Sequence, residues 1–226
     1  MQATSWVEVV VGVLIREDGR VLLNSRPEGK PYANYWEFPG GKIEPGETPH
    51  SALARELKEE LSIDLADSVP WFVMEHRYEH ANVRLHFRRS WDFFGPISAN
   101  EGQTYGFYAP NERTPGLILP ASEPVLAWVD LPNVWEDSTD ILTLTLTGHR
   151  STVVRDRHHR YVGAWAENFD DALRAQAMGY DFMVVKPEHF EAVLRDGEPL
   201  LPIYVQGVPS TSLREWQNKG AHGVKP

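Results

Sequence analysis

Residues 41–63 decide the fold of this chain: they read Gly41-Lys42-Ile43-Glu44-Pro45-Gly46-Glu47, then seven residues, then Arg55-Glu56-Leu57-Lys58-Glu59-Glu60-Leu61-Ser62-Ile63. Thr48 is a favoured N-cap residue and Pro49 suits a first helical turn, so the stretch predicts a helix that begins there. Leu53, Leu57 and Leu61 recur every four residues, which gives this helix one buried face. The sequence therefore predicts a glycine-containing loop followed by a short amphipathic helix.

The same helix carries three glutamates on one face. Glu56, Glu59 and Glu60 stand at i, i+3 and i+4, so their side chains lie one turn apart. Like charges at this spacing destabilise a helix unless a cation lies among them. Ligands that are all oxygen suit Mg²⁺ or Mn²⁺, which bind substrate phosphates while they keep several waters. The pattern favours a divalent metal site, and the alternative is a solvated acidic face.

The stretch resembles the Nudix box, Gly-x5-Glu-x7-Arg-Glu-U-x-Glu-Glu-x-Gly-U, in which U is an aliphatic residue. One position departs from it, because Ser62 stands where the box has its last glycine. That glycine serves the helix C-terminus, where a positive φ is easiest for glycine, so we expect a slight effect on geometry and little on metal binding. The resemblance to the MutT branch of the Nudix hydrolases covers residues 1–135. It includes Trp36–Lys42, Glu101–Gln103 and Leu119–Pro124.

This resemblance implies an α+β fold with a mixed sheet and the Nudix helix, and metal-dependent hydrolysis of a nucleoside diphosphate linked to another group. Such a reaction needs charge neutralisation on the phosphates, a positioned water and a base. Carried over by position, the ligands of Mg²⁺ or Mn²⁺ are Glu56, Glu59, Glu60, Glu101 and the carbonyl of Gly40. The same four glutamates and Arg55 form the expected catalytic set. Glu101 matches a further metal-binding or base carboxylate, and Arg55 is expected to pair with carboxylates and hold the helix to the loop.

Nucleotide binding is expected around the glycine turn. Lys42 and Arg26 are placed to meet phosphate oxygens, although solvent exposure is the commoner state of such side chains. Glu37 and Phe38 lie where the family has its nucleotide pocket, and Phe38 would pack against a purine or belong to the ordinary core. Ser122 takes the position of an Asn that reads the oxidised base in the branch that hydrolyses 8-oxo-dGTP. A hydroxyl cannot offer the paired donor and acceptor of an amide, so the base stays open.

Two functions follow from these residues. The favoured one is a MutT-like pyrophosphohydrolase that converts a nucleoside triphosphate to the monophosphate and pyrophosphate, with removal of oxidised purine deoxynucleotides as one variant. The alternative is a catalytically weak protein that binds a nucleotide or a thiamine-type phosphate as a sensor or partner. The complete set of carboxylates favours the enzyme.

Composition narrows the class of protein. The 226 residues suffice for one large or two small domains, and a formal net charge of −10 argues against a general nucleic-acid binder. The absence of cysteine excludes disulfides, thiolate zinc sites and a cysteine nucleophile. The apolar run from Val9 to Ile15 is too short to span a bilayer, and no basic region precedes it. We expect a cytoplasmic protein with a nucleotide substrate, without membrane or direct DNA binding, and leave a homodimer open.

Residues 1–135 have the pattern of several strands around one helix. A hairpin is expected from Glu8–Arg16 and Arg20–Asn24, because Glu17-Asp18-Gly19 is a strong turn signal. Further strands are expected at Phe72–Glu79, Val83–Phe93, Thr104–Tyr108 and Val125–Trp128. The domain boundary is expected near residues 133–139, which divides the chain into domains 1–135 and 136–226.

In residues 136–226, expected strands and helices alternate, which predicts parallel βα units and about half of a (β/α)₈ barrel. The charged residues 155–160 look like a loop. Strands are expected at Leu142–Thr147, Tyr161–Ala166, Tyr180–Val185, Leu201–Gln206 and Ala221–Val224, and helices at Asn168–Met178, Pro187–Arg195 and Ser212–Lys219.

This second part resembles the C-terminal half of thiamine phosphate synthase, a barrel enzyme. The resemblance rests on Val162–Asn168, Gly179–Phe182 and Gly220–Val224. The functional positions of that family are not kept: Trp165 stands for a serine, Glu167 for a histidine, and Gly207-Val208 for a phosphate-binding Gly-Gly pair. The front half of the barrel, with its pyrophosphate and metal residues, has no room in the chain. We therefore expect a relic or scaffold without synthase activity.

Overall fold

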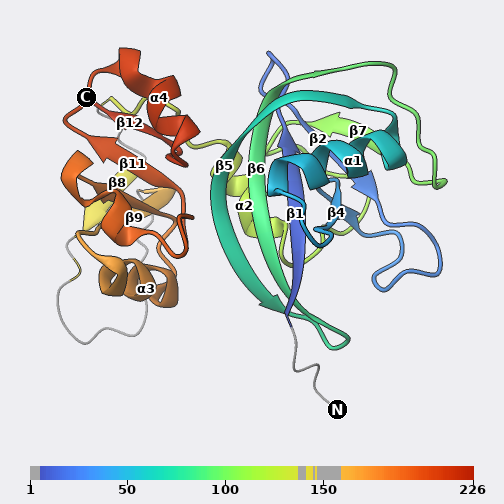
Figure 1. Cartoon of the computed structure of the whole chain (residues 1–226), viewed down its shortest axis with the longest axis horizontal. Coiled ribbons are helices and arrows are strands. Elements are labelled where there is room, and N and C mark those ends of the chain that lie inside the picture. Colours follow the sequence, from blue (N-terminus) through green and yellow to red (C-terminus); the bar gives the residue numbers. More distant parts are fainter. Residues whose placement is uncertain (1–5, 137–140, 145, 147–158) are drawn as a thin grey trace. The chain divides into compact units, whose positions relative to one another are not determined.

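The chain forms two compact units in the computed structural model, which describes residues 6–136, 141–144, 146 and 159–226 (Figure 1). The first unit comprises Met1–Val69 and Met74–Leu131, and the second comprises Pro70–Val73 and Pro132–Pro226. The division at residue 131 lies a few residues before the expected domain boundary. Residues 137–139 of the expected boundary region lie outside the described part of the chain.

The first unit contains a mixed four-stranded sheet and a three-stranded sheet (Figure 1). In the larger sheet, of order β4-β1-β6-β5, strand β1 runs parallel to β6 and antiparallel to β4, so the expected mixed sheet is confirmed. The smaller sheet has the order β3-β2-β7. The elements are β1 (Trp6–Leu14), β2 (Val21–Ser25), β3 (Trp36–Glu37), β4 (Gly40–Lys42), α1 (Pro49–Leu61), β5 (Asp64–Arg77), β6 (Asn82–Phe94), β7 (Tyr105–Tyr108) and α2 (Glu123–Val129).

Helix α1 has the bounds and the buried face that its sequence predicts. The Thr48 hydroxyl accepts from the Ser51 amide and the Ser51 hydroxyl accepts from the Thr48 amide, which satisfies two donors at the start of the helix. The leucines at positions 53, 57 and 61 are at most 1% exposed and pack in one core with residues of β1 and β2. Burial of each leucine is worth about 1.5–3 kcal/mol, so the apolar face fixes which side of the helix faces outward.

Two expectations for the first unit are corrected. The turn between β1 and β2 forms, with the Arg16 amide donating to the Arg20 carbonyl at 2.9 Å, but the two strands then enter different sheets instead of one hairpin. Val125–Trp128 was expected as a strand and is helical, within α2. The buried residues Val125 and Trp128 are three apart and a proline occupies the first turn, both of which suit a helix.

The second unit is a five-stranded sheet in which every neighbouring pair is parallel and the order β12-β11-β10-β9-β8 follows the sequence. Asn168 caps α3 through the Asp171 amide, and Gly179 ends it at φ 79°, as expected. The helix expected at Pro187–Arg195 is instead two short 3₁₀ turns. The elements are β8 (Ile141–Leu144), β9 (Tyr161–Trp165), α3 (Phe169–Met178), β10 (Phe182–Val185), η1 (Pro187–His189), η2 (Glu191–Val193), β11 (Ile203–Gln206), η3 (Ser210–Ser212), α4 (Leu213–Asn218) and β12 (Gly223–Lys225).

Several expectations for the second unit fall partly outside the described residues. The strand expected at Leu142–Thr147 is present as β8, whereas residues 145 and 147 are not described. The expected charged loop at 155–160 is described only from residue 159. No helix of the described part is both long and apolar enough to cross a bilayer.

The segment before β8 completes the core of the second unit. The Trp135 amide donates to the Val224 carbonyl at 2.9 Å, and the Val224 amide donates to the Asn133 carbonyl at 3.0 Å. The Trp135 ring packs edge-on against Phe182 and Tyr204, with ring centroids 5.6 and 5.4 Å apart. Strand β12 therefore has a neighbour on its outer side that begins before residue 140.

A fragment of residues 140–226 should not fold alone. It lacks Trp135, and loss of a buried tryptophan costs about 3–5 kcal/mol, which rivals the total stability of a small domain. We expect the fragment to aggregate or to lack a cooperative thermal transition, whereas the full chain, measured beside it, unfolds cooperatively as one unit or as a dimer. A soluble monomeric fragment with a sharp transition would show that the second unit does not need these residues.

Candidate active site

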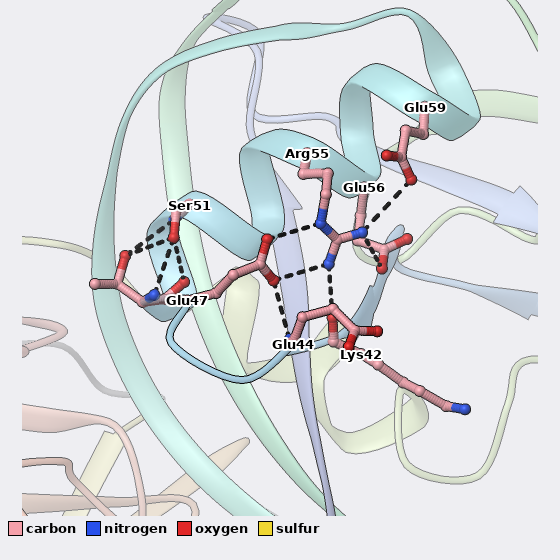
Figure 2. A network of polar contacts seen from close by, with 8 residues as sticks. Lys42, Glu44, Glu47, Ser51, Arg55, Glu56 and Glu59 are labelled. Carbon is pink, nitrogen blue, oxygen red and sulfur yellow. Dashed lines mark hydrogen bonds and ion pairs between the residues drawn. The ribbon is translucent and has the colours of Figure 1, made fainter.

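One arginine joins helix α1 to the loop before it (Figure 2). The Arg55 guanidinium donates to both carboxylate oxygens of Glu47, at 2.8 and 2.9 Å, and to Glu56 Oε1 at 2.9 Å. It also donates to the Lys42 carbonyl at 3.0 Å and lies 3.5 Å from Glu59 Oε2. The pairing expected for Arg55 is therefore present, and a direct part in catalysis stays a prediction.

The Arg55 charge changes the acid strength of its partner. Hydrogen bonds from Arg55, with a further one from the Glu44 amide at 3.0 Å, lower the pKa of Glu47 to about 2. The same carboxylates hold the pKa of Arg55 above its usual range. Because both oxygens of Glu47 are engaged, this residue orients the loop and is not free to act as a ligand.

A glycine at position 41 lets the Glu56 carboxylate lie against strand β4. A Cβ atom at this position would fall 2.1 Å from the carboxylate carbon of Glu56. At the neighbouring Gly40, a Cβ atom would fall 2.1 Å from the Val10 carbonyl oxygen on β1. The two glycines therefore allow close packing, of the Glu56 carboxylate in one case and of a neighbouring strand in the other.

The end of helix α1 positions Glu101. Residues 59–61 have carbonyl groups without helical partners, and the loop before β7 supplies donors to them. The Asn100 side chain donates to the carbonyl of residue 59 at 2.8 Å. The Asn100 backbone amide and the Gln103 side chain both donate to the carbonyl of residue 60. The Ser98 backbone amide donates to the carbonyl of residue 61. The Glu101 amide donates to Gln103 Oε1 at 2.9 Å. Capping of the helix thus brings the loop carboxylate to the helix carboxylates.

Glu60 is the carboxylate most affected by this arrangement. Burial, and then the charges of Glu101 and Glu56, raise its pKa to about 7, against an opposing effect of Lys30. Lys30 Nζ donates to Glu101 Oε2 at 2.8 Å, and that hydrogen bond raises the lysine pKa. The cluster is thus a set of repelling carboxylates with one ammonium group beside it.

The carboxylates of this cluster suit a divalent cation, because their ligand atoms are oxygens and their charge is negative. The neighbouring charges that help to raise the pKa of Glu60 would be offset by a cation among them, and oxygen ligands are those that Mg²⁺ and Mn²⁺ prefer. In the part of the chain that the structure describes, no three acidic or histidine side chains converge as a ready metal cage. Arg55 and Lys30 hold two of the carboxylates, Glu56 and Glu101, in ion pairs.

A cavity of about 510 Å³ brings most of the expected residues together. Glu59 is not among its lining residues, because its side chain is 62% exposed on the outer side of the helix, and Arg55 does not line it either. The expected residues that line the cavity are Arg26, Glu37, Phe38, Gly40, Lys42, Glu56, Glu60, Glu101 and Ser122.

Of the expected nucleotide contacts, Arg26 is the most engaged within the protein. It donates to both oxygens of Glu37, at 2.8 and 2.7 Å, and to the Pro31 carbonyl. Burial raises the pKa of Glu37 although Arg26 lies beside it. Phe38 and Ser122 are 3% and 4% exposed, so Phe38 belongs to the core and to the cavity wall at once.

Several polar residues that line the cavity were not assigned to the site from the sequence, among them Lys30, Tyr78, His80 and Asn24. Lys30 lies in a polar loop that gives no signal. Tyr78 and His80, whose stacked rings lie 5.5 Å apart, follow β5 in the turn to β6. Asn24 is a polar residue in the otherwise apolar Val-Leu-Leu run of β2, and that interruption was the available signal.

The raised pKa of Glu60 predicts a pH-dependent gain in stability for Glu60→Gln without metal. Ionised Glu60 is disfavoured in the folded state, so its ionisation lowers the free energy of unfolding. This destabilisation is absent below pH 4.5, the ordinary pKa of a glutamate, and is complete above about pH 7, the pKa of Glu60 in the folded state. In EDTA, the variant should unfold at a higher temperature than the wild type above pH 7, and the gain should vanish near pH 4.5. The exposed control Glu17→Gln should show no such trend, and an equal Tm of Glu60→Gln and wild type at pH 8 would contradict the raised pKa of Glu60.

Known proteins resemble the chain in this first part. The NUDIX domain family matches residues 6–141. A CTP pyrophosphohydrolase of Escherichia coli (strain K12) is 39% identical over 119 residues, which are 52% of this chain and 87% of that protein. An 8-oxo-dGTP diphosphatase of Haemophilus influenzae is 34% identical over 120 residues, 53% of this chain and 88% of that protein.

A solved structure agrees with these relatives. The crystal structure of a MutT NUDIX hydrolase from Burkholderia pseudomallei covers 54% of this chain and 96% of its own, with 25% identity and a TM-score of 0.50. The family match extends over more than half of the chain, and the box residues, the helix and the mixed sheet all lie within it. The chain therefore belongs to the NUDIX family.

Proposed function

We propose that the chain hydrolyses a nucleoside triphosphate, or a related nucleoside diphosphate derivative, to a nucleoside monophosphate and pyrophosphate with Mg²⁺ or Mn²⁺. By its family and the activities that name its relatives, the chain is a Nudix pyrophosphohydrolase. The observation that carries the proposal is one cavity lined by Glu56, Glu60 and Glu101 together with cationic side chains.

The groups proposed to hold the metal are oxygen donors of helix α1 and its neighbours. They are Glu56, Glu59, Glu60, Glu101 and the carbonyl of Gly40. Support comes from the mutual repulsion of Glu56, Glu60 and Glu101, which a cation would offset. When bound, such a metal neutralises phosphate charge and makes a coordinated water more acidic.

The remaining chemistry belongs to the protein's own side chains. Arg55 keeps Glu56 in place against β4, and the capped end of α1 keeps Glu101 beside Glu60. The pKa of Glu60, about 7, suits proton transfer near neutral pH and favours this carboxylate as the base. The resemblance to the family gives Glu101 as a further candidate base. Arg26, Lys30 and Lys42 line the same cavity and supply the positive charge that a polyphosphate needs in a protein of net charge −10.

The preferred base stays open within this proposal. The two relatives named above act on different bases, cytosine in one name and 8-oxoguanine in the other. Ser122, in the position of the base-reading Asn, lines the cavity but offers no amide. Oxidised purine deoxynucleotides are therefore one substrate class to test and not the default.

A second candidate is a catalytically weak nucleotide-binding sensor. It is favoured by one observation: the Glu59 side chain is exposed, held near Arg55 and outside the cavity lining. Release of pyrophosphate from a panel of nucleotides with Mg²⁺ separates the two candidates, because a sensor would bind but not turn over.

For residues 136–226 we propose a scaffold descended from a barrel like thiamine phosphate synthase. A parallel sheet whose strand order follows the sequence is the arrangement of a (β/α)₈ barrel, in which consecutive strands are neighbours.

For the whole chain we propose a cytoplasmic enzyme without membrane or DNA partners, since its net charge of −10 opposes binding to anionic surfaces. A homodimer is the oligomeric state to test.

Glu60→Gln and Glu59→Gln should each lower pyrophosphate release by orders of magnitude, because each keeps the side-chain size but removes a negative ligand. Initial rates on a nucleotide panel with Mg²⁺ measure this, and circular dichroism checks that the fold survives. Glu17→Gln, on the exposed turn after β1, is the control and should keep wild-type rates. Near wild-type hydrolysis by both variants would end the proposed mechanism.

The purified protein should not make thiamine phosphate. Trp165, Glu167 and Val208 occupy positions where the synthase has a serine, a histidine and a phosphate-binding glycine, and the front half of the barrel is missing. Incubation with the two precursors and Mg²⁺, followed by chromatography, should yield no product above the no-enzyme control. Enzyme-dependent product would contradict the scaffold assignment.

A further inference from the structure

Asn24 lines the cavity, and its buried side-chain oxygen has no hydrogen-bond partner among the described residues. The residue is 4% exposed. Its strand neighbours Val21, Leu22 and Leu23 are fully buried apolar residues. A buried acceptor left unpaired destabilises the fold, so an Asn in this place needs a reason outside the folded chain.

The backbone gives no such reason. Asn24 lies opposite Glu37 on one side and Tyr105 on the other, so β2 is paired along both edges at this residue without help from the side chain. Because directly opposite residues share a face of the sheet, Asn24 and Glu37 face the cavity together, as their presence in its lining also indicates. Glu37 is occupied by Arg26, which leaves the Asn24 oxygen to take a donor from a ligand.

We propose that the Asn24 amide reads the nucleobase and selects bases that carry an exocyclic amino group. This inference rests on the proposed function, since it assigns part of the substrate of the same site. An amino group donates to the free Oδ1, while Nδ2 can donate to an adjacent acceptor on the base edge. The amide supplies the donor and acceptor pair that Ser122 cannot, from β2 instead of the start of α2.

The preference follows from what replaces the amino group. Uracil in place of cytosine, or hypoxanthine in place of adenine, brings a carbonyl lone pair toward Oδ1, so the buried acceptor stays unpaired and is repelled as well. Hypoxanthine in place of guanine has a hydrogen where the 2-amino group was, so the acceptor stays unpaired. A site built to hydrogen-bond a substrate group rejects analogues that lack it. Cytosine and adenine therefore bind better than uracil and hypoxanthine, and guanine binds better than hypoxanthine where its 2-amino group, and not its 6-carbonyl oxygen, meets Oδ1.

The test compares kcat/KM for CTP with UTP, and for ATP and GTP with ITP, in the wild type and in Asn24→Leu. In the wild type, kcat/KM for the best amino-bearing substrate should exceed kcat/KM for its analogue by at least roughly tenfold, as expected for one hydrogen bond to a buried group. Asn24→Leu, which is similar in size, should abolish that preference by slowing the amino-bearing substrate and leaving the analogue within about twofold. The exposed Asn111→Leu is the matched control and should keep the preference.

Thermal stability distinguishes a role of Asn24 in base recognition from a role in the fold. Because Oδ1 is unpaired, the Asn24→Leu variant without nucleotide should have a Tm no lower than that of the wild type, whereas loss of an Asn that supports the fold would lower the Tm.

If no nucleotide is hydrolysed, the proposed function fails and binding decides the inference. Calorimetry then compares the affinity for CMP with that for UMP, and the affinity for GMP with that for IMP. A preference for the amino-bearing monophosphate that Asn24→Leu abolishes supports it. Absence of binding, absence of preference, or a preference that the variant keeps overturns it.

Discussion

The site depends on the guanidinium of Arg55. It gathers Glu47 from the loop, Glu56 from its own helix and a carbonyl from β4, so three segments that carry the chemistry share one cation. Its planar fork suits this task, because two carboxylates and a carbonyl can be bonded at once in fixed directions, which a lysine could not do. The ion pairs of Arg55 with Glu47 and Glu56 are partly buried, and the second of them holds the Glu56 carboxylate in place.

Charge explains why the cluster needs this support. In a chain of net charge −10, burial and then the charge of Glu101 raise the pKa of Glu60 to about 7. Arg55 and Lys30 each occupy one neighbouring carboxylate and thereby limit the repulsion. The carboxylates around Glu60 therefore keep negative charge that Arg55 and Lys30 do not fully balance. Such a site favours a divalent cation, and the cation in turn favours a bound polyphosphate.

Local signals were sufficient for helix α1, because Thr48, the leucines at every fourth position and the acidic face act within one or two turns. They failed at Val125–Trp128, where four apolar residues were read as a strand although the three-residue spacing of Val125 and Trp128 suits a helix. The sequence also could not place Lys30 beside Glu101, since 71 residues separate them and no pattern connects them. Asn24 was overlooked because a polar residue in a strand is informative only once the strand is known to be buried.

The box tolerates a change at position 62 but not at position 41, and the structure gives the reason. Ser62 adopts the left-handed conformation, φ 58°, which costs a non-glycine residue of order 1 kcal/mol. Asn100 donates to its hydroxyl at 3.1 Å, and the Ser62 amide still caps the helix, so a serine gains a contact that glycine could not make. At Gly41 a side chain would occupy the place of the Glu56 carboxylate, which would have to move away from Arg55 and β4. A departure from the motif therefore costs little where it strains one backbone angle, and more where it displaces a carboxylate of the proposed site.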